Sequence, residues 1–308
     1  MRGLFVNSEK NQCSIYESGL MIYNALRTKH KDIEYMEVSP RNMNERIYSG
    51  FDYYIFNWHH NTLPISKETL DNIHTLKIGI LLEVGPTEIK PFMQEDLFDA
   101  YMVLDPTKKQ SGKYYPFPRP LEVVDNLLPL LYEDVPVIGT FGFFVQGKNF
   151  AEVLQAANDL GQDCVLRMNL PDARFTGVSF QTVKDFANRL QRFKSSNVDL
   201  RITHDYMSKP DLIKWCSQNT LNVFPYHRNL PGLSAVTDQA IVAGRGIAIT
   251  DCDTFRHMNK YISYYPKETY LQLSKSTLPG IKQMQEDWSN DKFVAQFDKL
   301  LFEQMVGE

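Results

Sequence analysis

Strand-like and helix-like segments alternate along the first third of this chain, and no other feature of the sequence constrains its fold as strongly. The strand-like runs are rich in β-branched, aromatic and aliphatic residues, whereas the segments between them have helical periodicity or helix-capping residues. Alternation of this kind predicts βαβ units around a parallel sheet. The expected strands are residues 3–7, 33–38, 52–58, 76–82 and 100–104, with a helix over 14–26 and another after an N-cap at Ser66.

A proline-rich segment interrupts this alternation. Residues 114–120, YYPFPRP, hold three prolines, and Pro136 follows further along the chain. Because proline has no amide hydrogen to donate and its φ is fixed, this segment predicts a linker rather than a strand. The linker has room for a short helix over 121–130.

The alternation then restarts, which predicts a second domain on the same plan. We therefore expect an α/β protein with two doubly wound, Rossmann-like domains, residues 1–133 with the linker and residues 134–281, followed by a helical tail over 282–308. The expected elements of the second domain are strands at 136–141, 164–170, 198–203, 221–226 and 246–250, and helices at 148–160, 179–194, after Ser208, and at 233–243.

Composition excludes several other classes of protein. The 308 residues suffice for two cores of about 150 residues each, and the net charge of −4 gives no general attraction to nucleic acid. The longest uncharged apolar stretch, residues 135–147, is shorter than the roughly 18 residues that cross a bilayer. The four cysteines are scattered without a C-x-x-C pair, which suits reduced thiols better than disulfides or zinc. We expect a cytoplasmic protein with no signal peptide, no integral membrane segment and no bound metal.

The first expected loop of the second domain, residues 138–150, has the sequence IGTFGFFVQGKNF. Gly142, Gly147 and Lys148 match the spacing G-x-x-x-x-G-K of a P-loop, but Asn149 stands where a P-loop has a serine or threonine for magnesium. A lysine at a helix N-terminus is unfavourable unless an anion binds there, because the helix dipole repels cations. The alternatives are a P-loop, a loop for another phosphate, and a solvated lysine on an ordinary turn.

A second glycine-containing segment, residues 222–250, runs from a strand through a turn and a helix to another strand. Its sequence, NVFPYHRNLPGLSAVTDQAIVAGRGIAIT, has Pro231, Gly232 and Leu233 in the turn, and Ala243 and Gly244 close the helix. This pattern resembles the donor-binding segment of the GT-B glycosyltransferases, in which an acid precedes a P-F-G-L-like turn, a second acid lies eight positions on, and A-x-G-x-P-V follows. The resemblance implies two Rossmann-like domains with a cleft between them and a C-terminal helix that packs back on the first domain.

The resemblance also gives the loop at 138–150 a role. The family places a glycine-rich turn with a downstream lysine at the start of its second domain, and Lys148 occupies that place. The loop then resembles a cradle for the diphosphate of a nucleotide sugar rather than a P-loop, and Lys148 would also stabilise the leaving group in catalysis. The donor-binding residues that the resemblance indicates are Gly142, Lys148, Gly232, Leu233 and Ser234, with Asp238 as a substitute. Arg228 and Arg167 are secondary candidates for the positive charge that a leaving diphosphate needs. For Arg167, which lies within its expected strand, a structural ion pair is the alternative.

The chain departs from the family pattern at the most polar positions. Phe143 stands where the family has an arginine, and Asn229 and Thr237 stand where it has the two acids. Asp238, one place late, is with Gln239 the best substitute for the ribose contact, and a solvated helix surface is the alternative for Asp238. Ser234, with the amides at the helix start, is the best candidate for the diphosphate, and a plain N-cap is the alternative.

Candidates for the acceptor side lie at the expected strand ends of the first domain. The segment NWHHNT, residues 57–62, combines aromatic and polar groups that suit a sugar acceptor. Either of its histidines could take the acceptor proton as a base, and a structural hydrogen bond is the alternative role. The candidates are His59 and His60 for catalysis, and Glu9, Asn57, Glu83 and, less strongly, Asp105 for the acceptor side.

We therefore predict a metal-independent glycosyltransferase that needs no cofactor besides its nucleotide-sugar co-substrate. The acceptor is open between a glycan, a lipid, a protein and a nucleic-acid base, as are the oligomeric state and the choice between retention and inversion. One alternative keeps the fold but changes the reaction, to that of a sugar-nucleotide epimerase or a phosphorylase. The other is a non-catalytic nucleotide-sugar-binding or regulatory module, which the missing arginine and the displaced acids favour.

Overall fold

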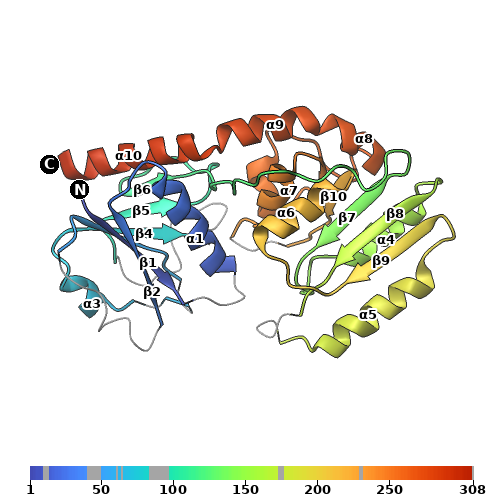
Figure 1. Cartoon of the computed structure of the whole chain (residues 1–308), viewed down its shortest axis with the longest axis horizontal. Helices are drawn as coiled ribbons and strands as arrows, with labels where there is room; N and C mark the ends of the chain where they lie inside the picture. Colours follow the sequence, from blue (N-terminus) through green and yellow to red (C-terminus); the bar gives the residue numbers. More distant parts are fainter. Residues whose placement is uncertain are drawn as a thin grey trace. The chain divides into compact units, whose positions relative to one another are not determined.

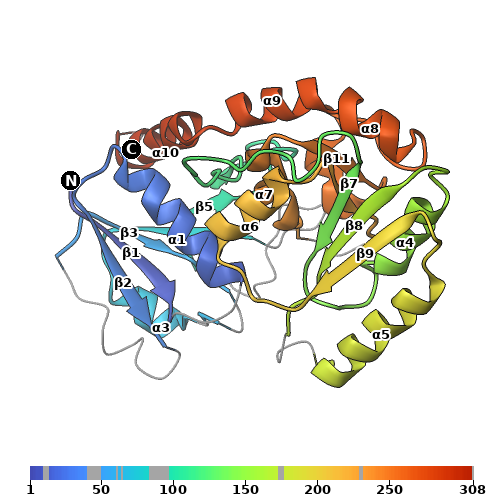
Figure 2. The same cartoon turned by 45° about the vertical axis from the view of Figure 1, so that its right-hand side comes forward.

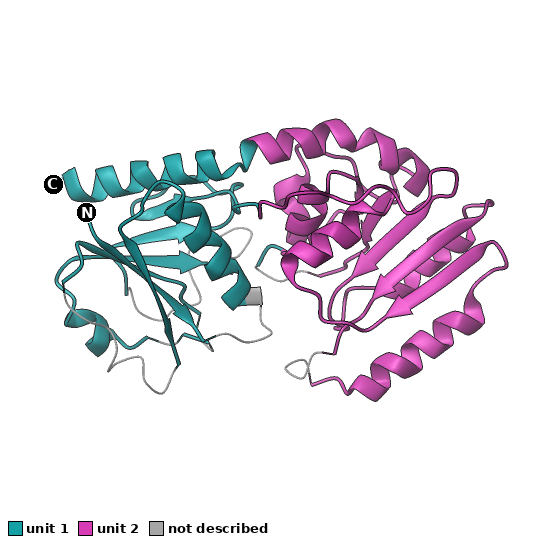
Figure 3. Ribbon diagram, viewed as in Figure 1, with its two compact units in different colours: residues 1–121, 231–233, 287–308 teal, residues 122–230, 234–286 magenta. Residues whose placement is uncertain are grey.

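The structure is a computed structural model that describes residues 1–9, 14–39, 50–59, 62–63, 65–82, 97–172, 177–228 and 232–306 (Figure 1). It divides into two compact units (Figure 3), and each is described by itself. Unit 1 comprises residues 1–121, 231–233 and 287–308, and unit 2 comprises residues 122–230 and 234–286. Within the described ranges, we find no helix with the length and apolar character that crossing a membrane requires.

Unit 1 is built on a six-stranded parallel sheet with the strand order β2-β1-β3-β4-β5-β6. Its strands follow the predicted alternation, and the parallel pairing confirms the predicted fold class. The strands are β1 (Gly3–Ser8), β2 (Ile33–Val38), β3 (Tyr53–Phe56), β4 (Leu76–Leu81), β5 (Ala100–Val103) and β6 (Tyr114–Pro116), and the helices of this unit are α1 (Ser14–Arg27), α3 (Lys67–Asp71) and α10 (Asn290–Val306). Ser66 caps α3 as predicted, because its side chain accepts the amide hydrogen of Thr69.

Strand β6 corrects the prediction that residues 114–120 form only a linker. It pairs with β5 at the edge of the sheet. Pro116 is its last residue, and an edge strand tolerates proline because one side of it has no ladder partner. The segment that follows contains no helix over 121–130.

Helix α10 packs against the same hydrophobic core as α1 (Figures 1 and 2). The Asp298 carboxylate accepts a hydrogen bond of 2.5 Å from the Lys29 ammonium group and lies 2.8 Å from Nε2 of His30, so polar contacts join the same two elements. The apolar face of α10 that enters this core consists of Phe293, Phe297, Leu300 and Leu301.

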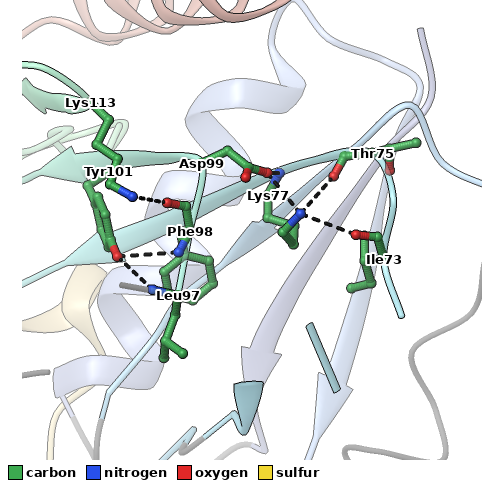
Figure 4. A network of polar contacts seen from close by, with 8 residues as sticks. All are labelled: Ile73, Thr75, Lys77, Leu97, Phe98, Asp99, Tyr101 and Lys113. Carbon is green, nitrogen blue, oxygen red and sulfur yellow. Dashed lines mark hydrogen bonds and ion pairs between the residues drawn. The ribbon is translucent and has the colours of Figure 1, made fainter. Parts of the chain in front are cut away.

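A polar network fixes the entry to β4 and β5 (Figure 4). The Lys77 amide and ammonium groups both contact the Asp99 carboxylate, at 2.8 and 3.0 Å, and the ammonium group also donates to the carbonyl oxygen of Ile73. The Tyr101 hydroxyl accepts the amide hydrogens of Leu97 and Phe98. The network lies at the amino ends of these strands, opposite the edge where parallel sheets bind ligands.

Unit 2 has a five-stranded parallel sheet with the strand order β11-β10-β7-β8-β9. Its core lies between the sheet and the helices that cover it, and Figure 2 shows β7, β8 and β9 side by side. The strands are β7 (Val137–Phe141), β8 (Cys164–Asn169), β9 (Val198–Thr203), β10 (Leu221–Phe224) and β11 (Gly246–Ile249), and the helices are α4 (Phe150–Asn158), α5 (Phe180–Phe193), α6 (Lys209–Ser217), α7 (Val236–Ala243), η2 (Asp253–Met258, a 3₁₀ helix), α8 (Tyr270–Ser276) and α9 (Leu278–Asp287).

Two helix starts in unit 2 differ from the prediction. Helix α4 begins at Phe150 rather than at residue 148, because Asn149 has a left-handed backbone with φ 51° and ends the loop before it. Helix α7 begins at Val236 rather than at residue 233. The prediction also missed α8 and η2, and it joined α9 and α10 into one helical tail.

Candidate functional site

The candidate site lies at the carboxyl edge of the unit 2 sheet, where β7 and β10 are neighbours. β7 is the first strand of this unit, and the chain reaches β10 only after passing through β8 and β9 on the other side of β7. The strand order therefore reverses between β7 and β10, and such a point opens a crevice at the carboxyl ends of parallel strands. The loops that follow these two strands carry the two sequence motifs.

Gly142, the first residue after β7, is held against the side chain of Lys148. Its φ of +132° is a conformation that favours glycine. A Cβ atom at this position would lie 2.7 Å from Lys148 Nζ, 3.5 Å from the Tyr226 hydroxyl and 3.8 Å from Val236 Cγ1. The loop after β7, the end of β10 and the start of α7 thus meet around this glycine.

The two loops are also tied together at Gly147. The Gly147 carbonyl oxygen accepts the amide hydrogen of His227 at 2.8 Å. Gly147 has a φ of +82° and no room for a side chain, since a Cβ at this position would lie 2.7 Å from Arg228 Cγ. The carbonyl oxygen of Arg228 in turn accepts a hydrogen bond from Thr254 Oγ1 at 3.1 Å. The glycine spacing of the motif therefore fixes the position of Lys148 relative to β10.

Lys148 is a buried cation, with only 6% of its surface exposed. Its ammonium group lies over the Tyr226 ring, 5.3 Å from the centroid, and has no hydrogen-bond acceptor or ion-pair partner in the part of the chain that the structure describes. Burial, and secondly the charge of Arg228, lowers the pKa of Lys148 to about 7. Cation–π attraction offsets only part of the cost of such burial, so this position favours a bound anion.

Tyr226 contributes a second polar group that lacks a partner. The residue is fully buried, and its hydroxyl forms no hydrogen bond within the described residues. Burial raises the pKa of this hydroxyl well above its ordinary value, against the opposing effects of Arg228 and of the nearby Ser234. The Ser234 side chain therefore lies near the Tyr226 hydroxyl but does not form a hydrogen bond with it. Tyr226 was not among the predicted site residues, although its position as the last residue of the expected strand 221–226, at the motif edge, was a usable signal.

Ser234 is not the helix cap that the sequence left as an alternative. The N-cap of α7 is Ala235, which provides no side-chain cap. The Ser234 amide donates to the carbonyl oxygen of Thr254 at 3.3 Å, and its own carbonyl oxygen accepts from Thr237 Oγ1 at 2.9 Å. Its side chain, beside Tyr226, is therefore the part of Ser234 that can contact a ligand.

Asp238 is buried, with 2% of its surface exposed, so the alternative of a solvated helix surface is wrong. It lies in the first turn of α7, where the positive end of the helix dipole favours a carboxylate. Gly232 and the buried Leu233 belong by their contacts to unit 1, whereas Lys148 belongs to unit 2. Arg167 has a structural role, because its guanidinium donates to Asn219 and to neighbouring oxygens.

The unit 1 candidates lie at or after strand ends, as expected from a parallel sheet. Asn57 is fully buried, and its amide nitrogen donates to Asn7 Oδ1 at 2.7 Å and to the Ile15 carbonyl oxygen at 2.9 Å, which ties β3 to β1 and α1. Glu9 is exposed, with its amide bonded to the Val38 carbonyl oxygen. His59 is half-buried and its carbonyl oxygen accepts from Leu63. His60 and Glu83 lie outside the described residues.

The Asn57 amide nitrogen therefore has a structural role, while the Asn57 Oδ1 atom is buried and has no partner among the described residues.

Over the same described residues, no group of three or more histidine, cysteine, aspartate or glutamate side chains is arranged to hold a metal ion.

Comparison with known proteins identifies the fold. No family model matches the sequence, and no curated protein matches it. Solved structures do match over nearly the whole chain. The structure of Anabaena Alr3699/HepE in complex with UDP and glucose has a TM-score of 0.62 at 9% identity, covering 98% of this chain and 99% of that one. The apo structure of OtsA has a TM-score of 0.64 at 10% identity, covering 99% of both chains.

A third match is the structure of an α-glucosyltransferase in complex with UDP-glucose and DNA containing an abasic site. It has a TM-score of 0.60 at 11% identity, covering 97% of this chain and 99% of that one. Together with the two parallel sheets, these matches show that the chain has the fold of the GT-B glycosyltransferases, as the motif at residues 222–250 implied.

Proposed function

We propose that the protein is a glycosyltransferase that moves a sugar from a nucleotide-diphosphate sugar to an acceptor without the help of a metal ion. The observation that carries this proposal is the buried Lys148 ammonium group, which has no acceptor among the described residues and faces Gly142 at the carboxyl edge of β7. An unpaired buried cation is costly, and a bound diphosphate supplies the missing acceptor. The neighbours HepE and the α-glucosyltransferase, solved with UDP or UDP-glucose, support a nucleotide sugar as the ligand.

In the proposed reaction, the bond between the anomeric carbon and the diphosphate oxygen breaks, and the nucleoside diphosphate leaves with the electron pair. The acceptor oxygen forms the new bond to that carbon and loses its proton. Negative charge grows on the diphosphate as its bond breaks, so a fixed cation stabilises the transition state more than the ground state. Lys148 and Arg228 supply this charge, which is the reason that we propose a metal-independent reaction.

The proton of the acceptor needs a base if the reaction inverts the configuration of the sugar. His59 and Glu9, which follow strands of the unit 1 sheet, are the described candidates for this role. Asn57 is better suited to holding the acceptor-side loops in place, because its amide nitrogen already binds Asn7 and Ile15.

Slow hydrolysis of the donor tests the proposal, because a glycosyltransferase transfers some sugar to water when its acceptor is absent. The protein is incubated with UDP-, GDP-, ADP- and dTDP-glucose, and the nucleoside diphosphate released is measured by chromatography. We expect release above the protein-free rate with at least one donor, lost in Lys148→Met and kept in Lys184→Met, which removes an exposed lysine of α5. A wild-type protein that binds a nucleotide sugar without releasing any nucleoside diphosphate would contradict the enzyme and support a binding module.

A further inference from the structure

We propose that Tyr226 is a further donor-binding residue, whose hydroxyl donates a hydrogen bond to the same phosphoryl oxygen that the Lys148 ammonium group binds. The inference rests on the proposed function, since it assumes that a diphosphate occupies the space beside Gly142. It adds a second neutral side-chain donor to a site in which the sequence pattern indicated cations, main-chain amides and Ser234.

The geometry around Gly142 carries the inference. The Tyr226 hydroxyl and Lys148 Nζ both lie within 4 Å of one point, the position where a Cβ of Gly142 would be, at 3.5 and 2.7 Å. Both groups are buried, and neither has a hydrogen-bond partner within the described residues. Two buried donors that lie this close together beside Gly142 can share an acceptor that carries negative charge, and charge-assisted hydrogen bonds of this kind are stronger than neutral ones.

The Tyr226 ring is held in place by its surroundings, so its hydroxyl is directed before any ligand binds. The ring packs against Phe224 at 6.2 Å and against Phe255 at 5.2 Å between centroids. The backbone is fixed as well, because the Tyr226 amide donates to the Phe224 carbonyl oxygen at 3.0 Å and its carbonyl oxygen accepts from Thr250 Oγ1. A hydroxyl fixed in this way loses little freedom on binding.

The alternative is that the hydroxyl is simply an unpaired polar atom of the core. Tyr270 in the same unit provides the matched control, because its hydroxyl is also buried and has no hydrogen-bond partner among the residues that the structure describes. The Tyr270 ring packs against Tyr265 at 4.9 Å, and no cation–π contact joins it to a lysine or arginine among the described residues. If both hydroxyls are merely unpaired, their removal should have the same effect.

The test compares wild type, Tyr226→Phe and Tyr270→Phe by isothermal titration calorimetry with UDP, GDP, ADP and dTDP. For the diphosphate that wild type binds most tightly, we expect Tyr226→Phe to raise the dissociation constant about ten-fold or more, as loss of a hydrogen bond to a charged group does. We expect Tyr270→Phe to leave it within about two-fold. Without ligand, both variants should be as stable as wild type or more stable, because each removes an unsatisfied buried hydroxyl.

A double-mutant cycle with Lys148→Met adds a second readout. If both side chains bind one oxygen, Tyr226→Phe should cost less affinity in the Lys148→Met background than in wild type. Equal affinity of Tyr226→Phe and wild type, or strictly additive effects in the cycle, would overturn the inference while leaving the proposed function intact. A wild-type protein that binds none of the four diphosphates would overturn both.

Discussion

A lysine that is buried beside an arginine destabilises the folded chain unless something binds to it, and Lys148 is in that position. Its side chain is 6% exposed, and burial and the Arg228 charge lower its pKa to about 7. The ordinary value for lysine is 10.5. The folded protein therefore carries at Lys148 the cost of a buried charge, and perturbed groups of this kind often lie at functional sites.

The pH dependence of stability follows from this residue. Between pH 7 and about 10, the unfolded chain keeps the Lys148 proton while the folded chain has lost it, so the free energy of unfolding rises with pH through this window. At about 1.4 kcal/mol per pKa unit, the full effect has an upper limit of about 5 kcal/mol. We expect Lys148→Met to be more stable than wild type at pH 7, with the difference shrinking towards pH 10, as measured by denaturant unfolding.

Other groups also titrate in this range; burial raises the pKa of the Cys164 thiol to about 11, for example. Because these groups are present in both wild type and Lys148→Met, their contributions cancel in the difference between the two proteins. Lys184→Met serves as the control, because the Lys184 side chain is exposed on α5. A difference between wild type and Lys148→Met that stays constant across pH 7 to 10 would show that Lys148 is not perturbed.

At the scale of elements, the site depends on two loops that follow strands distant in sequence but adjacent in the sheet. The bond from the His227 amide to the Gly147 carbonyl oxygen and the close fit of Gly147 on Arg228 join the loop after β7 to the loop after β10. Sequence could predict each loop, because glycine spacing and strand ends are local signals. It could not predict that Tyr226 and Lys148 meet, because that depends on the non-local pairing of β10 with β7.

Gly142 tests this arrangement of the loops. Gly142→Ala places a Cβ at φ +132°, 2.7 Å from Lys148 Nζ, so it should both destabilise the fold and weaken the binding of UDP-, GDP-, ADP- or dTDP-glucose. Gly50→Ala is the control, because Gly50 has a similar φ of +111° but nothing within 4 Å of its would-be Cβ. We expect both to lose about 1–3 kcal/mol of stability, and only Gly142→Ala to weaken binding. Unchanged affinity in Gly142→Ala would separate this glycine from the ligand.

At the scale of the whole molecule, the two parallel sheets and their helices were predictable because the alternation of strands and helices is a strong pattern. What escaped prediction were short elements whose local signals conflict with their place in the fold. Prolines concealed β6, which exists because an edge position tolerates them. Helix α7 starts at Val236 rather than at residue 233, with Ala235 and not Ser234 at its N-cap.

This chain shares its fold, but little of its sequence, with the solved structures that it matches. Structures at 9–11% identity match 97–99% of this chain, while the arginine and the two acids typical of the GT-B donor segment are replaced by Phe143, Asn229 and Thr237. Of the residues that the motif singled out, Gly142 and Lys148 lie together beside Tyr226. The proposed function therefore depends on whether that small cluster binds a nucleotide sugar.

Calorimetric titration of wild type, Lys148→Met and Lys184→Met with UDP-, GDP-, ADP- and dTDP-glucose tests this most directly, since it measures binding apart from the stability change that Lys148→Met causes. We predict that wild type binds at least one of these donors, that Lys184→Met binds it equally well, and that Lys148→Met binds it about ten-fold more weakly or worse. Equal binding by wild type and Lys148→Met, or no binding by wild type, would contradict the account.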